Sequence, residues 1–429
     1  MSHEVRRATL RAGGTGVLVH SLRPTTANTV DVPGDVKRML DEVRRRGDDA
    51  LIEQARAFGS PDFTHDCIRV TPVSLGNALG RIPAPLRRAI EVAADQVRAV
   101  AEAQRPTDCV VALEHGQRVT IRAVAVDSAG CYVPGGRAAY PSSLIMATVP
   151  AQVAGVRRIA IASPAGPDNK VSDVVRATAA ILGVDEVYAV GGAGAIGALA
   201  YGTATVSPVA VIAGPGNAWV TEAKRQVHGV VGIDSLAGPS EVLILADGSA
   251  DPGLVTLDLL AQAEHGPDSV AVLASTDPEV TDGVGQRLRD VSSTVPGAIT
   301  LIDCMSLPLM IELAEALAPE HLQLVLRASD IEASVAQISR SGCVFLGRNG
   351  ATAFGDYVAG SNHILPTAGA ARFASSVGPA TFMRRMSVVE IPQAAVDALG
   401  AHVSVLAEAE GFPLHGRSVT ARMTPGELR

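Results

Sequence analysis

The sequence predicts an α/β fold with two incomplete doubly wound parallel-sheet units, a helical N-terminal segment and a small C-terminal extension. Three observations support this prediction. From about residue 155, strand-like apolar runs alternate with helical patterns, as in parallel sheets that are covered on both faces. Before that point, apolar residues recur at helical spacing. The 429 residues are also enough for two or three domains.

The same patterns predict each element in order. Helices are expected over 33–57, interrupted near Gly47, and over 84–104, followed by a connection at 104–108 and a hairpin over 110–125. Strands are then expected at 158–162, 186–190, 209–213, 241–246, 270–274, 299–303 and 343–346. Helices are expected between most of these strands, at 171–182, 217–227, 253–265 and 308–318. The two units should divide near 235–242, and the last fifty residues return to helix and a polar tail.

Composition excludes several kinds of protein. The net charge of −8 and the isoelectric point near 5.7 disfavour nucleic acid as a partner, which requires a concentrated basic surface. The five cysteines (67, 109, 131, 304 and 343) form no CxxC pair, which indicates reduced thiols and a cytoplasmic protein. We expect no membrane partner, because no uninterrupted apolar stretch reaches ~18 residues. The first residues also lack the layout of a signal peptide.

One glycine-rich segment matches the dinucleotide-binding pattern G-x-G-x-x-G. Gly192–Gly197 follows an expected strand and opens an expected helix, which is the context that this pattern requires. The next strand, however, should end in an acidic residue that holds the ribose. It ends at Gly214 instead, and no acid occurs before Glu222. A plain glycine-rich turn, an orthodox dinucleotide site and a nucleotide bound in another manner all remain open.

Three further glycine-rich loops lie at residues 132–136, 214–217 and 237–241. Each by itself suits an ordinary turn. Together with Gly192–Gly197 they fall within roughly 110 residues, and three of the four lie near expected strand ends. Ligands of α/β sheets bind at carboxyl strand ends, so this clustering favours a binding crevice. Ser240 is not in a G-x-S-x-G turn and is not interpreted as a nucleophile.

Polar pairs supply candidates for catalysis. Gln262 and His265 lie at positions i and i+3 of an expected helix, where they could share a metal or form polar surface. Glu320 and His321 follow Pro319 at the expected end of a helix. A carboxylate beside an imidazole suits general acid–base chemistry, and a histidine that satisfies helix-end carbonyls is the structural alternative.

Two more such pairs occur toward the C-terminus. Asp356 and His363 flank a glycine-rich polar loop, and Glu410 and His415 lie near Pro413. A surface loop and a solvated tail are the structural alternatives. Imidazole, carboxylate and amide groups form a plausible zinc-binding set, but spacing alone cannot establish it, because these residues lie far apart in the chain.

These features occur together in one known family. From about residue 30 to 420, the chain resembles histidinol dehydrogenase. The segments that carry the resemblance are Cys131–Gly136, Tyr140–Ser143, Gly214–Asn217, Val231–Asp234, Ala237–Glu241, Gln262–His265, Ala318–His321, Gly355–Tyr357 with Asn362 and His363, and Glu410 with His415. Each segment alone is weak, and their combination in this order is highly specific.

The resemblance implies a zinc-dependent enzyme of histidine biosynthesis that oxidises L-histidinol to L-histidine through L-histidinal, with two NAD+ and one zinc per subunit. Catalysis would fall on Glu320 and His321, with His321 removing the hydroxyl proton and Glu320 activating water. The implied zinc ligands are Gln262, His265, Asp356 and His415. Implied substrate contacts are Ser240, Gln262, His265, His321, Asp356, His363, Glu410 and His415. The cofactor positions would be Tyr132, Asn217 and Gly194.

The resemblance also implies a homodimer with shared active sites, in which His415 comes from the partner subunit. Residues 1–27 would form an N-terminal segment. Residues 28–130 with 242–377 would form a Rossmann-like domain that carries the zinc ligands, and 131–241 a second such domain on the cofactor side. Residues 378–429 would form a C-terminal extension that reaches the partner.

One position departs from the family pattern. A glutamine that contacts the cofactor aligns with Gly194, which has no side chain to donate or accept a hydrogen bond. This change also creates the apparent G-x-G-x-x-G, so the match to that pattern is interpreted as accidental. Because related dehydrogenases with the same zinc set act on other polar alcohols, a sulfonated propanediol is the alternative substrate. A zinc hydrolase and a non-catalytic α/β protein are the alternatives from other classes.

Overall fold

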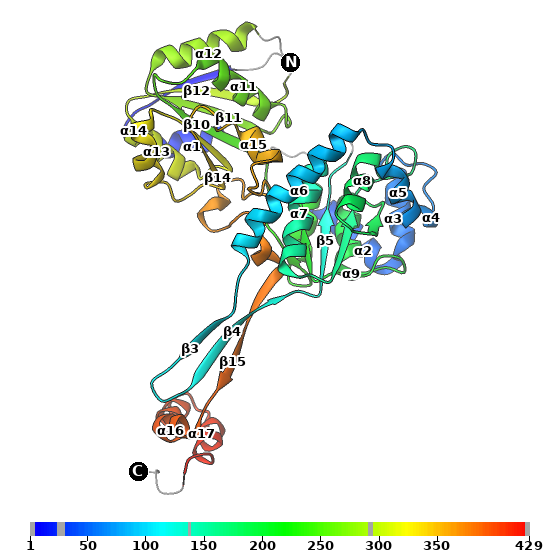
Figure 1. Ribbon diagram of the computed structural model, residues 1–429, viewed down its shortest axis with the longest axis vertical. Coiled ribbons are helices and arrows are strands. Elements are labelled where there is room, and N and C mark those ends of the chain that lie inside the picture. Colours follow the sequence, from blue (N-terminus) through cyan, green and yellow to red (C-terminus); the bar gives the residue numbers. More distant parts are fainter. Residues whose placement is uncertain (1–4, 24–30, 136–138, 291–294, 425–429) are drawn as a thin grey trace. The chain divides into compact units, whose positions relative to one another are not determined.

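Figure 1 shows the computed structural model, which describes residues 5–23, 31–135, 139–290 and 295–424. Its contacts divide the chain into two compact units. Unit 1 comprises residues 1–104 and 127–382, and unit 2 comprises residues 105–126 and 383–429. Within the described residues, unit 1 holds two six-stranded sheets and unit 2 a three-stranded sheet. The predicted α/β class is therefore confirmed.

Sheet A of unit 1 is entirely parallel and has the strand order β1-β12-β11-β10-β13-β14. Its strands are β1 (Val5–Leu10), β10 (Glu241–Ala246), β11 (Val270–Ser275), β12 (Ala298–Cys304), β13 (His321–Val325) and β14 (Cys343–Leu346). The helices that accompany it are α1 (Thr15–Leu22), α11 (Pro252–Ala263), α12 (Pro278–Asp290), α13 (Leu307–Leu317) and α14 (Ala328–Val335).

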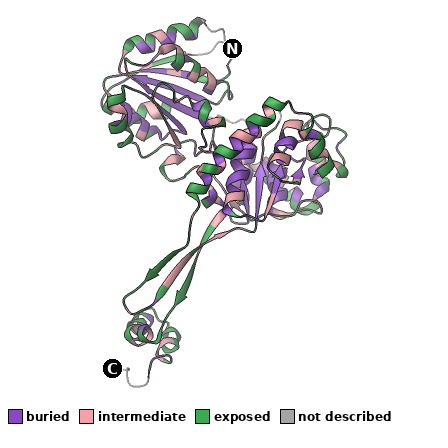
Figure 2. Cartoon of the chain, in the orientation of Figure 1, coloured by how far each residue is buried: buried purple, intermediate pink, exposed green. Residues whose placement is uncertain are grey.

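Sheet A buries both of its faces, as Figure 2 shows for its central strands. Along β10, Val242 and Ile244 join the core under α11 and α12, whereas Leu243 and Leu245 join the core under α1 and α13. Successive side chains of a strand point to opposite faces. A strand with both faces covered therefore tends to be apolar on both faces, and the continuous apolar run at 242–246 is what predicted the strand at 241–246.

Sheet B of unit 1 has the order β2-β7-β6-β5-β8-β9, in which only the edge strand β2 is antiparallel. Its strands are β2 (Arg69–Val70), β5 (Ser128–Tyr132), β6 (Arg158–Ala162), β7 (Glu186–Tyr188), β8 (Val211–Ala213) and β9 (Gly232–Ile233). The accompanying helices are α2 (Val32–Arg46), α3 (Asp48–Ala57), α4 (His65–Ile68), α5 (Pro72–Leu79), α6 (Ala84–Gln104), α7 (Pro141–Ala154), α8 (Asp173–Ile181), α9 (Gly192–Tyr201) and α10 (Ala218–Val227).

Each parallel sheet has a point at which its chain order reverses. In sheet A the chain runs outward from β10 through β11 to β12 and returns to the other side of β10 as β13. In sheet B it runs from β5 through β6 to β7 and returns beside β5 as β8. Doubly wound sheets bind ligands outside the carboxyl ends of the strands at such reversals. The β5–β8 reversal therefore locates a candidate cofactor region.

The N-terminal half is grouped differently from the expectation. Residues 28–130 were expected to join 242–377, but α2 packs on α9 and α10, α6 packs on α7, and β2 pairs with β7 of sheet B. The physical reason is close helix packing, because α2 brings Leu40 against Gly197 of α9, where an added Cβ would lie 3.0 Å from Leu40 Cδ2. The expected N-terminal segment also contributes a strand that the sequence did not predict, since β1 pairs with β12.

Unit 2 is built from an antiparallel sheet and a helix pair. Its strands are β15 (Met383–Glu390), β4 (Arg118–Ala125) and β3 (Cys109–Ala112), in that order, and the β3–β4 pair is the hairpin expected over 110–125. Helices α16 (Gln393–Ala409) and α17 (Pro413–Thr420) pack on each other. Among the described helices of the chain, none combines the length and apolarity needed to cross a bilayer.

Candidate active site

The Glu320–His321 pair lies between the end of a helix and a strand that starts at His321. Helix α13 stops at Leu317, Ala318 takes a left-handed conformation with φ of 47°, and β13 then starts at His321. His321 is in register with Val242 of β10. The pair thus follows the end of a helix, as expected, but the strand that starts at His321 was not predicted from the sequence. The strand was missed because polar Gln323 interrupts its apolar run, although Gln323 Nε2 is satisfied by donating to Asp258 Oδ2 at 2.8 Å.

Glu320 is held by a short hydrogen-bond chain. Its Oε2 accepts from Ser240 Oγ at 2.6 Å and from the backbone N–H of Glu241 at 2.9 Å. Ser240 Oγ in turn accepts from Gln262 Nε2 at 2.9 Å. Burial raises the pKa of Glu320 to about 8, although the two bonds to Oε2 oppose this shift. Glu320 is therefore a carboxyl group that changes charge close to neutral pH.

His321 presents one nitrogen with no partner. The side chain is only 4% exposed, and its Nδ1 lies 3.3 Å from the carbonyl oxygen of Glu241. A carbonyl can only accept, so Nδ1 carries the proton and Nε2 is left as the basic nitrogen. Nε2 is buried, has no hydrogen-bond partner among the described residues, and lies 4.0 Å from Asp356 Oδ1.

The surroundings of His321 keep it neutral. Burial lowers its pKa, the Asp356 carboxylate opposes that change, and the nearby His265 imidazole lowers the pKa slightly further. The same influences act on His363, whose pKa is also lowered by burial. A neutral imidazole with a bare Nε2 in a buried position is suited to accept a proton from a bound molecule.

Asp356 and His363 are brought together by helix α15 (Thr352–Tyr357) and the loop after it. His363 Nδ1 donates to the backbone oxygen of Asp356 at 2.8 Å. Its Nε2 lies 3.3 Å from Ser143 Oγ of α7, and Asn362 Nδ2 donates to the Met146 oxygen at 2.7 Å. These bonds fix the loop against α7, so the mobile surface loop considered as an alternative is not supported.

Helix α11 positions the amide and imidazole that the sequence singled out. Gln262 is buried in its last turn, and His265 follows just beyond its end. His265 Nδ1 donates to the Ala261 oxygen at 3.0 Å, which leaves Nε2 as an available lone pair. Because α11 runs antiparallel to β10, its end lies beside the start of that strand. Residues distant in the sequence thus converge at the amino edge of sheet A.

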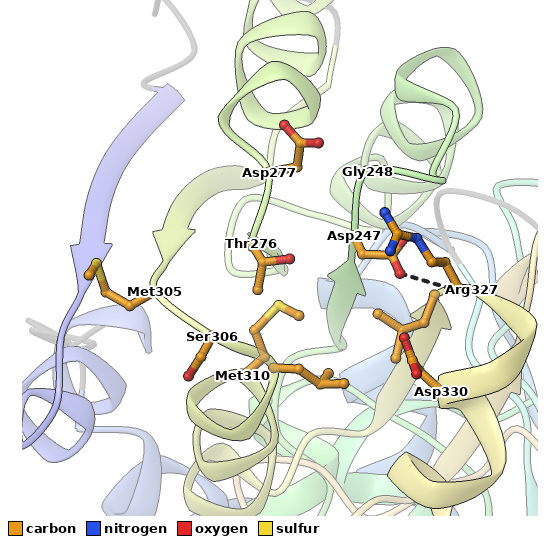
Figure 3. A pocket seen from close by; sticks show the side chains of 11 residues that line it. Asp247, Gly248, Thr276, Asp277, Met305, Ser306, Met310, Arg327 and Asp330 are labelled. Atoms are coloured by element: carbon orange, nitrogen blue, oxygen red, sulfur yellow. Dashed lines mark hydrogen bonds between the residues drawn. The ribbon is translucent and has the colours of Figure 1, made fainter.

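The opposite edge of sheet A carries a separate cavity, shown in Figure 3. It has a volume of about 400 Å³ and lies at the ends of β10, β11, β12 and β13. Two of its acids already serve the backbone there. Asp247 Oδ2 accepts from Arg327 N at 2.8 Å, and Asp277 Oδ1 accepts from Glu279 N at 2.9 Å. A six-residue strand, about 20 Å long, separates this cavity from Ser240.

The expected cofactor positions lie at the carboxyl edge of sheet B. Tyr132 ends β5, is 4% exposed and accepts a hydrogen bond from Gly192 N at 3.1 Å. Asn217 is exposed and caps α10, with its Oδ1 accepting from Trp219 N at 3.1 Å and Val220 N at 3.2 Å. The expected loops after β5, β7 and β8 therefore gather at one edge. Gly136, the last residue of the first loop, lies outside the described residues.

Gly194 serves helix packing. It is buried inside α9, and a Cβ added there would lie 2.2 Å from Gln54 Oε1 of α3. Gly197 faces α2 in the same way. Gly194 and Gly197 therefore allow α9 to approach α3 and α2, whereas Gly192 has a positive φ of 59° and no close neighbour. Close helix packing accounts for the second and third glycines of the pattern.

The buried Glu320 predicts a pH-dependent stability. Its folded pKa of about 8 lies above the ordinary glutamate value, so the folded chain retains a proton that the unfolded chain releases. The stabilising effect of this proton is complete below about pH 4.5 and is lost as the pH rises toward 8. Relative to Glu320→Gln, the wild-type free energy of unfolding should fall by roughly 3–4 kcal/mol over this range. Urea unfolding in the presence of a chelator measures the difference.

The exposed Glu332 of α14 provides the matched control. The free energy of unfolding of Glu332→Gln should follow that of wild type at every pH. The Glu320 prediction is contradicted if wild type and Glu320→Gln change in parallel between pH 4.5 and 8.

Comparison with known proteins identifies the family. A family model described as histidinol dehydrogenase matches residues 22–423. The chain belongs to the histidinol dehydrogenase family. Histidinol dehydrogenase of Synechococcus sp. is 45% identical over 399 residues, covering 90% of this chain and 91% of that protein. The Rhodospirillum rubrum enzyme is 43% identical over 407 residues, covering 92% and 93%.

The fold agrees with the same family. The crystal structure of histidinol dehydrogenase from Elizabethkingia anophelis has a TM-score of 0.92 to this chain at 30% identity, and the match covers 98% of each chain. Membership of the histidinol dehydrogenase family makes the chain an oxidoreductase with a small-molecule substrate.

Two expected residues of the histidinol dehydrogenase site lie in unit 2. Glu410 ends α16 and His415 lies in α17, and both are exposed. The His415 and Phe412 rings lie 5.3 Å apart. Within the part of the chain that the structure describes, no three His, Cys, Asp or Glu side chains gather closely enough to hold a metal.

Sequence reasoning assigned no role to Ser143 or to the backbone of Glu241. Both contact the histidines of the candidate site, at 3.3 Å from His363 Nε2 and 3.3 Å from His321 Nδ1. Ser143 belongs to Tyr140–Ser143, one of the segments that carry the family resemblance. That segment was the available signal. A backbone carbonyl leaves no trace in residue type, so Glu241 could not be found in this way.

Proposed function

We propose that this chain oxidises L-histidinol to L-histidine through L-histidinal, with two NAD+ and one zinc per subunit. Family membership supports the reaction class. The observation that carries the proposal is the buried Nε2 of His321, which has no partner among the described residues and faces Asp356. An unsatisfied buried nitrogen has a cost in free energy that a bound hydroxyl group would remove.

The residues present fit a zinc ion. His265 offers Nε2, because its Nδ1–H is held by the Ala261 carbonyl, an arrangement that orients metal-binding histidines. Gln262 offers its amide oxygen, because its Nε2 donates to Ser240. With the Asp356 carboxylate and His415 from the partner subunit they form a four-ligand set of a kind that zinc accepts. When bound, zinc would anchor the amino and imidazole nitrogens of histidinol.

His321 is proposed to act as the base in both oxidations. Its Nε2 takes the hydroxyl proton of the alcohol while the carbon-bound hydrogen leaves as hydride to NAD+. The resulting imidazolium lies beside Asp356, whose Oδ1 at 4.0 Å favours the charged form. After returning this proton to solvent, His321 performs the same step on the hydrated aldehyde, which yields the carboxylic acid and a second NADH.

Glu320 is proposed to activate the water that hydrates the aldehyde. A carboxyl group with a pKa of about 8 gains and loses a proton readily near neutral pH. The hydrogen bonds from Ser240 and the Glu241 N–H hold it beside His321, with Glu320 Oε2 3.5 Å from His321 Nδ1. The proposed substrate contacts are Ser240, Gln262, His265, His321, Asp356 and His363, together with Glu410 and His415 of the partner subunit.

NAD+ is proposed to bind at the carboxyl edge of sheet B. The reversal between β5 and β8, where Tyr132 and the turn before Asn217 meet, supports this position. The Tyr132 ring is buried, so its contribution would come from the exposed part of its loop and from the hydrogen bond that it accepts from Gly192. Asn217 remains exposed for contact with the nucleotide.

A cytoplasmic homodimer with shared sites is proposed. Unit 2 supports this proposal with many exposed apolar side chains: Val110, Val111, Leu113, Val388, Val389, Ile391, Val403, Val405, Leu406, Phe412 and Leu414. Monomeric proteins rarely expose apolar side chains at such density on a small unit. Burial against a second copy would carry Glu410 and His415 to the partner's site.

The test is the yield of NADH. Purified chain with L-histidinol and excess NAD+ should form two NADH and one histidine per histidinol consumed, because both oxidations occur on one bound substrate. Absorbance at the NADH band and amino-acid analysis measure the two products. Chelation should abolish the reaction, and added zinc should restore it.

A panel of alcohols separates the alternatives. A sulfonated propanediol and a simple diol should be inert. One NADH per turnover on a diol, with histidinol unreactive, would replace histidinol by the polar-alcohol alternative. Full activity of chain shown to be free of metal would refute the zinc site.

A further inference from the structure

A buried ion pair outside the proposed chemistry joins α10 to the segment after β9. Lys224 Nζ lies 2.6 Å from Asp234 Oδ1, and the two side chains are 3% and 1% exposed. Buried ion pairs are weak contributors to stability, because desolvation offsets their attraction. A pair kept at this depth therefore suggests a role in fixing a conformation.

The pair holds both backbone polar groups of one residue. Gly214 N donates to Asp234 Oδ2 at 2.8 Å, and Lys224 Nζ donates to Gly214 O at 2.5 Å. Gly214 has φ of 126°, and a Cβ there would lie 2.0 Å from the Tyr132 carbonyl oxygen. The turn after β8 thus packs closely against the end of β5, and Lys224 and Asp234 hydrogen-bond to its backbone at Gly214.

The clamped turn leads directly to the proposed cofactor residue. Asn217 is three residues from Gly214 and caps the same helix, α10, that carries Lys224. Asp234 is itself fixed beside β8, because its backbone N–H donates to the Ile212 carbonyl oxygen at 3.1 Å. The position of Asn217 at the β5–β8 reversal is therefore set by Lys224 and Asp234 together.

We propose that Lys224 and Asp234 are positioning residues for NAD+: they hold the 214–217 turn in the conformation that receives the dinucleotide. This inference rests on the proposed use of NAD+ at the edge of sheet B. Neither residue touches the reacting atoms, so their removal should weaken NAD+ binding and leave the chemistry at His321 intact once NAD+ is saturating.

The test replaces the pair by apolar groups, as Lys224→Met with Asp234→Leu, so that no unpaired charge is buried. The dissociation constant of NAD+ by calorimetry and its KM should both rise between about tenfold and a hundredfold, as expected for a misplaced binding group. The kcat at saturating NAD+ and the KM for histidinol should stay within about twofold of wild type. The reason is that the proposed substrate-binding and catalytic residues of unit 1 lie at the amino edge of sheet A.

Trp219 gives a second readout that needs no ligand. It is the single tryptophan of the chain and lies in the first turn of α10, two residues after Asn217. Acrylamide quenching of its emission should change in the double variant if the turn has moved. Arg158→Met with Glu186→Gln is the matched control, because that pair joins β6 and β7 of the same sheet at 3.1 Å without touching the turn.

The outcomes separate the inference from the proposed function. A folded double variant with wild-type NAD+ affinity and unchanged Trp219 quenching overturns the inference, even if its melting temperature falls. If wild type itself binds no NAD+, the proposed function fails. Trp219 quenching alone then tests whether Lys224 and Asp234 hold the 214–217 turn in place. Should the double variant fail to fold, Asp234→Asn, which keeps one of the two acceptor oxygens, should show a smaller change in the same direction, and no change overturns the inference.

Discussion

Replacing His321 by asparagine should lower kcat by about a thousandfold, within the range usual for loss of a general base. Asparagine can still donate toward the Glu241 carbonyl as Nδ1 does now, but it has no basic nitrogen at the position of Nε2. The zinc content should stay at the wild-type level, because His321 is not among the proposed ligands. Steady-state kinetics and metal analysis of the same preparation measure the two quantities.

The pH profile adds a second expectation for the same variant. Burial lowers the pKa of His321 below the ordinary histidine value, so the part of the wild-type acid limb that reports His321 should lie at a pH below the pKa of a free imidazole. Titration of Glu320, whose pKa is about 8, should appear as a separate change at higher pH. The residual activity of His321→Asn should lack this acid limb. His65 pairs with Asp48 at 3.0 Å outside the site, and His65→Asn is the matched control. Wild-type turnover in His321→Asn would contradict the proposed role of His321 as the general base.

Mixing two inactive variants should restore activity if sites are shared between subunits. A His265→Ala chain and a His415→Ala chain each lack one proposed zinc ligand at every site of their own homodimers. In a mixed dimer, one of the two sites combines an intact His265 with an intact His415. Random pairing makes half of the dimers mixed, so the mixture should recover about a quarter of the wild-type activity per chain.

The control for this experiment mixes two variants of the same unit. His265→Ala with Asp356→Ala should recover nothing, since both residues belong to unit 1 and every mixed site lacks one of them. Verified mixed dimers of His265→Ala and His415→Ala without activity would contradict the sharing of His415. Zinc content should follow activity in each mixture.

Much of the fold follows from local patterns. Several strands of both sheets are apolar at all but their first position, as at 158–162 and 241–246, because helices cover both faces. Local patterns failed to predict a strand whose buried polar side chains are satisfied by specific partners. Strand β13 contains the polar residues His321 and Gln323. Their burial is compensated by hydrogen bonds to the Glu241 carbonyl and the Asp258 side chain, which come from other parts of the chain. Strand β1 was missed because its pairing with β12 is separated by almost 300 residues.

The sequence by itself determined the residue types of the candidate site, and hence the family and the class of reaction that those types suit. Only the tertiary structure decided their states: a Glu320 with a raised pKa, a neutral His321 with a bare Nε2, and the Lys224–Asp234 grip on Gly214. The reason is that a residue type specifies which groups are available. Their protonation and orientation depend on burial and on partners that the fold brings from distant parts of the chain.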